Sequence, residues 1–382
     1  MKVLVLGGAG AMGMVTVRDL AESPGVAKVV VGDVHPERVK QLKTLPASEK
    51  LLLKEVDVTN SQSLVKAMRE VDAVANATPY HLNLEVTKAA IEAEKNLTDL
   101  GGVYHMTLKQ LELNELAKKA GATVVLGCGV APGIADIVAK YGADKLDHVE
   151  EVHIRYGEVN LTPAKYKWTF RTVLEEYTSG PVVYQNGKFK NLAPFSGKHV
   201  VKFKDPIGER PCCFALYSGI ATLPHTVGKG VKVVDCAMSY TEEDEQRIRV
   251  LTEMGLTSNE PMKVGETAIT PREFLLRCAP PPDTDVRDAA GIVVDVIGEK
   301  DGESVKCTYD LAYKYHERYK TSALAYLTGV PLSIVSQMLA KGEIQERGVL
   351  PPETAVKPEA FTAELAKKGV QIHETIQRTH TL

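Results

Sequence analysis

The sequence predicts an α/β fold in which a doubly wound parallel sheet is followed by an inserted α+β domain with a mainly antiparallel sheet. Short apolar runs alternate with helically spaced segments from residue 3 to residue 126, and a glycine-rich loop follows the first run. After Gly127, apolar and polar residues alternate at period two. We therefore expect an N-terminal Rossmann domain over 1–127, an α+β domain over 128–317, and a C-terminal helical segment over 318–382 that returns to the Rossmann domain.

Six runs in the first part are expected to be strands, because they are short and apolar or β-branched. They are residues 3–6, 29–31, 54–58, 73–77, 97–100 and 123–126. Helical spacing between them predicts helices over 12–22, 36–44, 61–70, 82–93 and 107–120. Asn60 is a good N-cap for the third of these helices. Strands and helices in this alternation form a parallel sheet covered on both faces.

The second part has the alternation of half-exposed antiparallel strands. We expect a helix over 134–141, then strands over 149–156, 182–184, 199–203, 231–240, 291–297 and 305–309. Helices over 170–177 and 243–254 separate them, and Asn186-Gly187 predicts a tight turn. Beyond residue 318 the chain has a helical pattern interrupted by Pro331, and we expect no further strands.

The bulk composition narrows the class of partner. The 382 residues include 46 Lys plus Arg and 49 Asp plus Glu, so the formal net charge is −3. A weakly acidic chain offers no electrostatic reason to bind nucleic acid or an anionic membrane, and no apolar run approaches the roughly 20 residues of a membrane helix. The six cysteines form no Cys-x-x-Cys pair, so no metal site is expected. A strand begins directly after Met1, which leaves no room for a signal peptide and predicts a cytoplasmic protein.

The glycine loop Gly8-Ala9-Gly10-Ala11-Met12-Gly13 lies between the first strand and the first helix. Gly8 would permit the tight turn, Gly10 would let the backbone approach a pyrophosphate, and Gly13 would let the helix pack closely on the strand. The helix N-terminus, at Ala11 and Met12, offers free N–H groups to phosphates. The alternative is a bare glycine turn in another α/β protein. The motif in this context predicts a dinucleotide site.

An acid at the end of the second strand bears on which dinucleotide binds. Asp33, followed by Val34, lies twenty residues after Gly13, where a carboxylate accepts hydrogen bonds from the adenosine ribose diol and repels a 2′-phosphate. NAD is therefore favoured over NADP, although Arg38 could in principle reach a phosphate. Sheet topology also predicts contacts from the ends of the third and fourth strands, with Asp57 and Val58 near the adenine, and Ala77 and Thr78 near the nicotinamide ribose.

Four motifs in one order carry a family resemblance: the glycine loop, Asn-Ala-Thr-Pro-Tyr at 76–80, Asp-Leu-Gly-Gly at 99–102 and Gly-Val-Ala-Pro-Gly-Ile at 129–134. Together they resemble the saccharopine dehydrogenase-like family, most closely its lysine 6-dehydrogenase branch. The resemblance implies pyridine-nucleotide-dependent oxidation or reduction at a carbon bearing nitrogen, and a homodimer formed through the second domain. Saccharopine reductases carry an acid where this chain has Ala131, and a cysteine near Arg155, which argues against saccharopine as the substrate.

Several polar and aromatic residues are candidates for the chemistry. Tyr80 and His81 follow the fourth strand and are expected to line the substrate cleft, unless the ring packs in a helix turn. Tyr104 and His225 are candidate proton-relay residues; the alternative for Tyr104 is an exposed loop. The remaining substrate candidates are Trp168, Arg171 and Thr222. The resemblance places Trp168 over the substrate, although it could instead be a core ring. Arg171 could hold a carboxylate or lie on a solvated face.

Three hypotheses about function follow. The first is an NAD-dependent oxidoreductase that deaminates an amino acid or related amine, with lysine oxidised at its ε-carbon as the best single prediction. The second keeps the enzyme class but makes the substrate a conjugate, so that a saccharopine- or carboxynorspermidine-type reductase forms a secondary amine. The third is a non-catalytic NAD-binding sensor, because no strong catalytic acid is visible.

Overall fold

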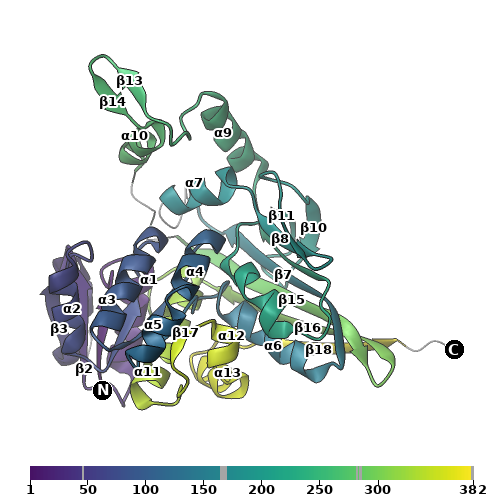
Figure 1. Ribbon diagram of the computed structural model, residues 1–382, viewed down its shortest axis with the longest axis horizontal. Helices are drawn as coiled ribbons and strands as arrows, with labels where there is room; N and C mark the ends of the chain where they lie inside the picture. The colour runs from purple at the N-terminus through teal and green to yellow at the C-terminus, as the bar shows by residue number, and fades with distance from the viewer. Residues whose placement is uncertain (45–46, 164–169, 281–282, 284–285, 380–382) are drawn as a thin grey trace.

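Two sheets organise the computed structural model, which describes residues 1–44, 47–163, 170–280, 283 and 286–379 (Figure 1). The first sheet has seven parallel strands in the order β17-β6-β5-β4-β1-β2-β3. Its strands are β1 (Lys2–Leu6), β2 (Lys28–Asp33), β3 (Leu51–Glu55), β4 (Ala73–Asn76), β5 (Asn96–Asp99), β6 (Thr123–Val125) and β17 (Gly348–Leu350). The order reverses between β1 and β4, and ligands of such sheets bind at this switch point, beyond the carboxyl ends of the strands.

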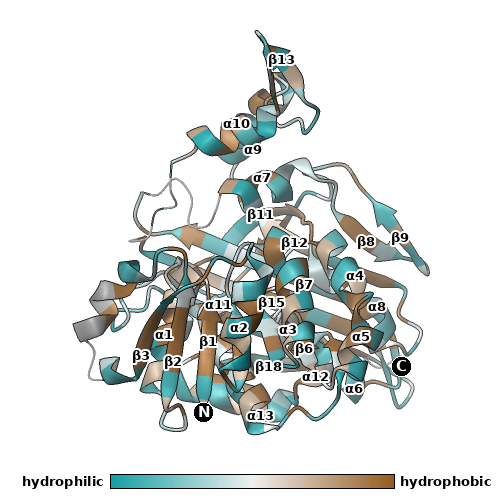
Figure 2. Ribbon diagram, turned by 60° about the vertical axis from the view of Figure 1, so that its left-hand side comes forward, coloured by the Kyte–Doolittle hydropathy of each residue, from teal (hydrophilic) through white to brown (hydrophobic). Residues whose placement is uncertain are grey.

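Helices connect these strands and cover the sheet. They are α1 (Ala11–Glu22), the 3-10 helices η1 (Pro36–Thr44), η2 (Ser48–Lys50) and η3 (Tyr80–Leu82), and then α2 (Ser61–Arg69), α3 (Asn83–Glu92), α4 (Tyr104–Leu111) and α5 (Asn114–Lys119). The side chain of Asn60 accepts a hydrogen bond from Ser63 N at 3.2 Å and so caps α2 as expected. Strand β1 is fully buried from its second residue on, and Figure 2 colours it as hydrophobic over most of its length.

Strand β3 is where the expected boundaries fail. We placed it at 54–58, whereas it spans Leu51–Glu55 and ends before Val56. Leu52 and Leu53 are exposed because β3 is the edge of the sheet, so its apolar pattern does not mark a buried run. The helix expected over 107–120 is likewise two helices, α4 and α5.

The second sheet has nine strands, with main order β10-β11-β12-β7-β15-β16-β18. They are β7 (His148–Asn160), β8 (Val182–Gln185), β9 (Lys188–Asn191), β10 (His199–Lys202), β11 (Glu209–Phe214), β12 (Val233–Ser239), β15 (Asp288–Lys300), β16 (Glu303–Lys314) and β18 (His373–Thr379). Strands β7 and β12 pair in parallel, and the other pairs are antiparallel. Helix α6 (Ile134–Lys145) packs against β15 and β7, and the largest hydrophobic cluster lies there.

A smaller helical part projects from this sheet and stands at the top of Figure 1. It contains α7 (Phe170–Thr178), α9 (Glu242–Glu253), α10 (Pro271–Cys278) and the two-stranded ribbon of β13 (Met262–Val264) and β14 (Thr267–Ile269). Leu174 and Tyr177 of α7 pack with Ile248 of α9 in a separate small core. The 3-10 helix η4 (Ser218–Ala221) packs against α4, and α8 (Leu223–Val227) packs against α6.

The C-terminal segment joins both sheets. It forms α11 (Ala323–Lys341), α12 (Pro352–Ala355) and α13 (Pro358–Lys367), and it also contains β17 and β18. The expectation that no strand follows residue 318 is therefore wrong. Strand β17 pairs with β6 in the first sheet, and β18 pairs with β16 at the edge of the second. Both strands are hard to recognise, because β17 has three residues and every residue of β18 is exposed.

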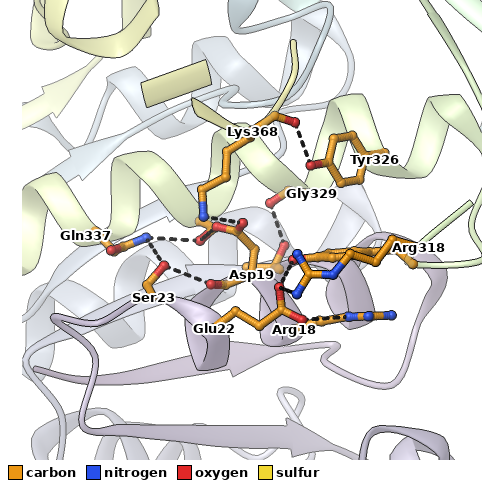
Figure 3. A network of polar contacts seen from close by, with 12 residues as sticks. Arg18, Asp19, Glu22, Ser23, Arg318, Tyr326, Gly329, Gln337 and Lys368 are labelled. Carbon is orange, nitrogen blue, oxygen red and sulfur yellow. Dashed lines mark hydrogen bonds and ion pairs between the residues drawn. The ribbon is translucent and has the colours of Figure 1, made fainter. Parts of the chain in front are cut away.

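Helix α11 packs against α1 through a network of polar contacts (Figure 3). The buried Asp19 carboxylate of α1 forms an ion pair with Lys368 Nζ at 2.7 Å and accepts a hydrogen bond from Ser333 Oγ at 2.6 Å. Thr16 Oγ1 donates to Gly329 O at 2.9 Å. Burial raises the pKa of Asp19 above its ordinary value even though Lys368 opposes that shift. The charge of Asp19 therefore depends on the partly buried Lys368.

By length and composition α11 could also cross a membrane, contrary to the expectation that no apolar run approaches that length. Its mean hydropathy reaches 1.5, but 83% of its most apolar window is buried inside the protein. Gly329 shows how close the packing is, since a Cβ at this position would lie 2.6 Å from Met12 O. These contacts are those of a core helix.

Candidate cofactor and substrate cleft

A cavity of about 810 Å³ extends from the glycine loop to the second sheet. Its walls come from the loop, from the ends of β2 and β4, from the turns after β5 and β6, and from the second sheet with α7 and α11. The residues that line it include Gly7, Gly10, Ala11, Met12, Asp33, Val34, Arg38, Val56, Val58, Ala77, Thr78, Tyr80, Ala131, Tyr156, Thr172, Glu176, Tyr217, Cys236 and Met238.

The turn of the loop is made by a different glycine from the one that the motif predicts, whereas Gly13 has its predicted role. Gly7, not Gly8, has the positive φ of the turn, at +67°, and a Cβ there would lie 2.8 Å from Ala77 O. Gly8 is needed because a Cβ would lie 2.8 Å from Val31 Cγ1. A Cβ on Gly13 would lie 2.1 Å from Gly7 O, so only glycine allows α1 to pack this closely on the loop.

The N-terminus of α1 provides an anion site at the loop. Gly10 is its N-cap, has extended backbone and makes no side-chain capping bond, and Ala11 and Met12 line the cavity. The first N–H groups of a helix have no partner within the helix, and the helix dipole favours negative charge there. Only Gly7 O, at 3.3 Å, lies near a Cβ built on Gly10. This backbone fits a pyrophosphate, and Gly8 and Gly13 support it from outside the lining.

Asp33 lies at the end of β2, as the motif requires of a ribose-binding acid. Its Oδ2 accepts a hydrogen bond from Ala9 N at 3.0 Å, and its Oδ1 accepts one from His35 N at 2.9 Å. Each carboxylate oxygen has a second lone pair, so the group can still accept bonds from a ribose diol. Val34 and Arg38 line the same end of the cavity.

Asp57 does not line the cavity, which corrects its expected contact with adenine. Its Oδ1 accepts hydrogen bonds from Thr59 N at 2.9 Å and from Thr59 Oγ1 at 2.7 Å. These bonds hold the pKa of the exposed Asp57 carboxyl below its ordinary value. Val56 and Val58 form this wall instead, and their apolar side chains suit the face of an adenine ring.

A chain of hydrogen bonds between asparagine side chains shapes the cleft where β4 ends. Asn76 Oδ1 accepts hydrogen bonds from Thr78 N at 3.1 Å and from Thr78 Oγ1 at 2.6 Å, and Asn76 Nδ2 donates to Asn83 Oδ1 at 3.0 Å. Asn83 Nδ2 in turn donates to Gly101 O at 2.9 Å. The polar groups of these buried residues are thereby fixed at the switch point, where Ala77 and Thr78 line the cavity.

Tyr80 lines the cavity, but its neighbour His81 does not. Burial, and then the charge of Glu175, raises the pKa of Tyr80 to about 12, so its hydroxyl keeps its proton at neutral pH. His81 is exposed and makes an edge contact with the Tyr80 ring at 5.8 Å. Burial of part of its ring and the nearby Arg171 lower the pKa of His81.

The structure does not bring the two candidate proton-relay residues to the cavity. The rings of Tyr104 and His225 face the Phe189 ring of β9, with centroids 5.9 Å and 5.8 Å from it. Neither residue is among those that line the cavity. The expectation that they act on the substrate there therefore lacks the required proximity.

Of the three remaining substrate candidates, Arg171 and Thr222 do not line the cavity. Arg171 forms a two-bond pair with Glu273, with both distances at 2.8 Å, and its guanidinium is therefore already engaged. Thr222 is buried and donates to Gly219 O at 3.3 Å. Trp168 lies outside the described residues.

The sequence reasoning missed the side chains that form the far end of the cavity. Glu176 of α7 has one carboxylate oxygen, Oε2, that is closed to solvent and has no hydrogen-bond partner among the described residues. Burial, and then the charge of Glu158, raises the pKa of Glu176 to about 8. Tyr156 of β7 donates its hydroxyl to Glu158 Oε2 at 2.8 Å. The sequence offered no signal for Glu176, because it lies on the face of α7 opposite the core residues Leu174 and Tyr177, and a helical pattern assigns that face to solvent.

A second buried carboxyl fixes the wall near Ala131. Asp136 accepts hydrogen bonds from Tyr217 Oη at 2.8 Å and from Gly133 N at 2.7 Å. Burial, and then the charge of Glu353 on α12, raises the pKa of Asp136 well above its ordinary value. Tyr217 and the turn at 129–133 are thus held in place, and Ala131 and Tyr217 both contribute to the lining.

The fold and this cleft define a two-domain pyridine-nucleotide oxidoreductase, with a Rossmann sheet on one side and a second, mixed sheet on the other. Comparison with known proteins gives the family. Residues 3–125 match the family model described as the saccharopine dehydrogenase NADP binding domain, and residues 129–370 match the saccharopine dehydrogenase C-terminal domain. The chain belongs to the saccharopine dehydrogenase-like family, which confirms the resemblance seen in its motifs.

Relatives of nearly equal length support the same class. A carboxyaminopropylagmatine dehydrogenase of Synechocystis sp. is 23% identical over 98% of both chains. A carboxynorspermidine synthase of Vibrio cholerae is 24% identical over 85% of this chain and 83% of its own. The apo saccharopine dehydrogenase (L-Glu forming) of Saccharomyces cerevisiae has the same fold, with a TM-score of 0.74 and 18% identity over 98% of this chain and 99% of its own.

These relatives make the protein an NAD(P)-dependent oxidoreductase that acts on amine substrates. The hypothesis of a non-catalytic sensor is set aside. The narrower prediction of lysine as the substrate is not supported by these names, which describe conjugates. It stays a prediction.

Proposed function

We propose that the protein forms a secondary amine by reducing the imine that an amine and an aldehyde produce, or oxidises that secondary amine in reverse. The amine nitrogen and the aldehyde carbon condense with loss of water, a hydride adds to the imine carbon, and a proton adds to the nitrogen. The names of the full-length relatives support this reaction, because each describes a conjugate. Ala131, where saccharopine reductases carry an acid, argues for a conjugate other than saccharopine.

The residues of the cleft would divide the work between them. The backbone of Gly10, Ala11 and Met12 would hold the pyrophosphate of the dinucleotide, and Asp33 would hold its adenosine ribose. The nicotinamide supplies or accepts the hydride when it is bound. Tyr80 keeps its hydroxyl proton and can donate a hydrogen bond where the cofactor and substrate ends meet.

The observation that carries the proposal is the continuity of the cavity from Gly10 to Glu176. A hydride can pass only between carbons held in contact, and a single cavity admits a dinucleotide and an amine together. The test is NADH consumption with an amine and a four-carbon amino-acid aldehyde, aspartate β-semialdehyde, because the term carboxyaminopropyl describes such a unit. Oxidation of NADH that requires both the aldehyde and an amine supports the proposal. No oxidation with a panel of mono- and diamines contradicts it.

A second candidate is the oxidative deamination of lysine at its ε-carbon. Ala131 favours it, because the lysine 6-dehydrogenase branch shares the Ala-Pro-Gly run at 131–133 and Ala131 lines the cavity. Lysine and NAD alone should then give NADH and ammonia at alkaline pH. An absence of both products, with coupling activity present, removes this candidate.

We further propose that NAD is preferred over NADP. The matching family model is described as an NADP binding domain. Asp33, however, places a negative charge where the 2′-phosphate of NADP would bind. Arg38 lines the same end and is the residue through which NADP could still be accepted. The ratio of kcat/KM for the two cofactors tests this preference.

We also propose a homodimer formed through the second domain, as the resemblance implies. Sedimentation of the purified protein tests it, and a monomer at assay concentration contradicts it.

A further inference from the structure

The far end of the cavity is formed by one face of α7. Thr172 and Glu176 lie four residues apart, one helical turn, and both line the cavity. Leu174 and Tyr177 are on the opposite side, in the small core with Phe195 and Ile248. The packing of these two residues fixes the rotation of the helix, so the carboxyl of Glu176 is directed at the cavity.

Glu176 lacks a counter-charge among the described residues. The neighbouring cations are already engaged: Arg272 Nη2 donates to Glu175 Oε2 at 2.6 Å, and Arg171 is paired with Glu273. The described lining contains two other charged side chains, Asp33 and Arg38, and both lie at the adenosine end. A buried carboxylate without a partner is costly. A cationic ligand in the cavity would supply the missing partner.

The nearest charged group that acts on Glu176 is another carboxyl. Glu158 of β7 is close enough to Glu176 to raise its pKa. Tyr156 lines the cavity and donates its hydroxyl to Glu158 at 2.8 Å. Glu158 therefore offers Glu176 no counter-charge, whereas a cation in the cavity would be attracted to the Glu176 carboxylate.

We propose that Glu176 is the recognition site for a second cationic group of the amine substrate, an ammonium or guanidinium at the end of the chain remote from the reacting nitrogen. This inference rests on the proposed function and names its substrate class: diamines and aminoguanidines, as opposed to amines with an apolar or anionic end. Ammonium and guanidinium groups are donors only, and they match a carboxylate acceptor.

The test compares two amines of equal carbon chain, 1,4-diaminobutane and n-butylamine, each with aspartate β-semialdehyde and NADH. Wild-type protein should prefer the diamine in kcat/KM. Glu176→Gln keeps the shape of the side chain but removes its charge, and it should reduce the kcat/KM for the diamine at least about 30-fold, because a lost buried charge pair has this effect. It should leave the value for n-butylamine within about threefold.

The matched control is Glu243→Gln, which removes the same charge from an exposed carboxylate of α9, outside the cavity. It should leave the preference for the diamine unchanged. If Glu176→Gln reduces both amines equally, or does not change their ratio, the inference is overturned while the proposed function stands. If the wild-type protein uses neither amine, the proposed function itself fails.

Calorimetry gives a readout that does not depend on turnover. With NAD bound and at pH 7, binding of 1,4-diaminobutane should release a proton from Glu176, because a cation favours the ionised carboxyl. Titrations in two buffers with different heats of ionisation measure this proton. Proton release that is equal in wild-type protein and Glu176→Gln overturns the inference, and a smaller release in the variant supports it.

Discussion

The two ends of the cavity are made in different ways. At the cofactor end, the glycine loop contributes a run of sequence neighbours, Gly7 and residues 9–12, and Asp33 adds a carboxylate. At the substrate end, side chains from separate elements meet: Tyr156 on β7, Glu176 on α7 and Met238 on β12. A backbone site has a fixed spacing in the sequence, whereas a side-chain site depends on how distant elements pack. The first end serves a common cofactor, and the second can vary with the substrate.

The largest expected effect concerns the support beneath the cofactor end, where the buried carboxylate of Asp19 has a partner, in contrast to Glu176. Lys368→Met should reduce the free energy of unfolding by about 3–5 kcal/mol, because it leaves the Asp19 charge buried without a counter-charge. Urea denaturation followed by circular dichroism measures it. The double variant Asp19→Leu with Lys368→Met should recover much of the loss, and equal instability of the two variants would contradict the role of the ion pair.

Gly13→Ala tests whether the cofactor end depends on close backbone packing. A Cβ would lie 2.1 Å from Gly7 O, so the loop must move. NADH binding should weaken at least about 100-fold, since shifts of about 1 Å at such sites have effects of this size. Fluorescence titration of NADH measures the affinity. Gly121→Ala is the control, because nothing lies within 4 Å of a Cβ at that position although its φ is +66°. Equal affinity of Gly13→Ala and wild type would contradict the packing argument.

Asp33→Ser tests the carboxylate at the cofactor end. It should reduce the kcat/KM for NAD by about 10–100-fold, because hydrogen bonds to a charged acceptor are lost, and should leave NADP equal or better. Asp33→Asn keeps an acceptor and removes the charge, so it should lie between the wild type and the serine variant in the NAD/NADP ratio. Equal losses for both cofactors in Asp33→Ser would show that the residue only supports the loop through Ala9.

The buried carboxyl of Glu176, at the substrate end, should make the free energy of unfolding depend on pH. The pKa of Glu176 is raised to about 8 in the folded protein, against an ordinary value of 4.5. As the pH rises, Glu176 therefore loses its proton earlier in the unfolded chain than in the folded protein. The free energy of unfolding of the wild type falls as a result between about pH 4.5 and 8. Glu176→Gln avoids this loss. Its advantage should be absent at pH 4 and should reach on the order of 1–2 kcal/mol at pH 9, once screening by water in the cavity is allowed for. Differential scanning calorimetry at both pH values measures it. An advantage that does not change with pH would contradict the buried ionisation.

The smallest effects should come from the two residues that the sequence indicated as proton relays. Tyr104→Phe and His225→Gln should each change kcat by less than about threefold, because neither side chain lines the cavity and surface changes have small effects. Steady-state assays at saturating substrate measure kcat. Tyr80→Phe is the informative partner, since Tyr80 does line the cavity. A loss of more than tenfold in either of the first two variants would show that the substrate extends beyond the described walls.

The same contrast explains which strands and which site residues could be predicted from the sequence. The buried parallel strands β1 and β4 were found because they are continuous apolar runs, and β7 and β15 because they alternate. Strands β9, β13 and β18 were missed because all of their residues are exposed, which leaves no pattern of burial. The glycine loop and Asp33 were found from their spacing. Glu176 was missed because its significance depends on a cavity shared with β7 and β12, and on partners that are not adjacent to it in the chain.

The C-terminal segment has a consequence for how the protein is made. Strand β17 completes one edge of the first sheet, β18 completes one edge of the second, and α11 covers α1 between them. All three are synthesised after the strands and the helix that they contact. Until these residues have been added, α1 lacks its cover and the edges of β6 and β16 are unpaired. Neither sheet can reach its final form before then, so the completion of the first six strands does not complete an N-terminal domain.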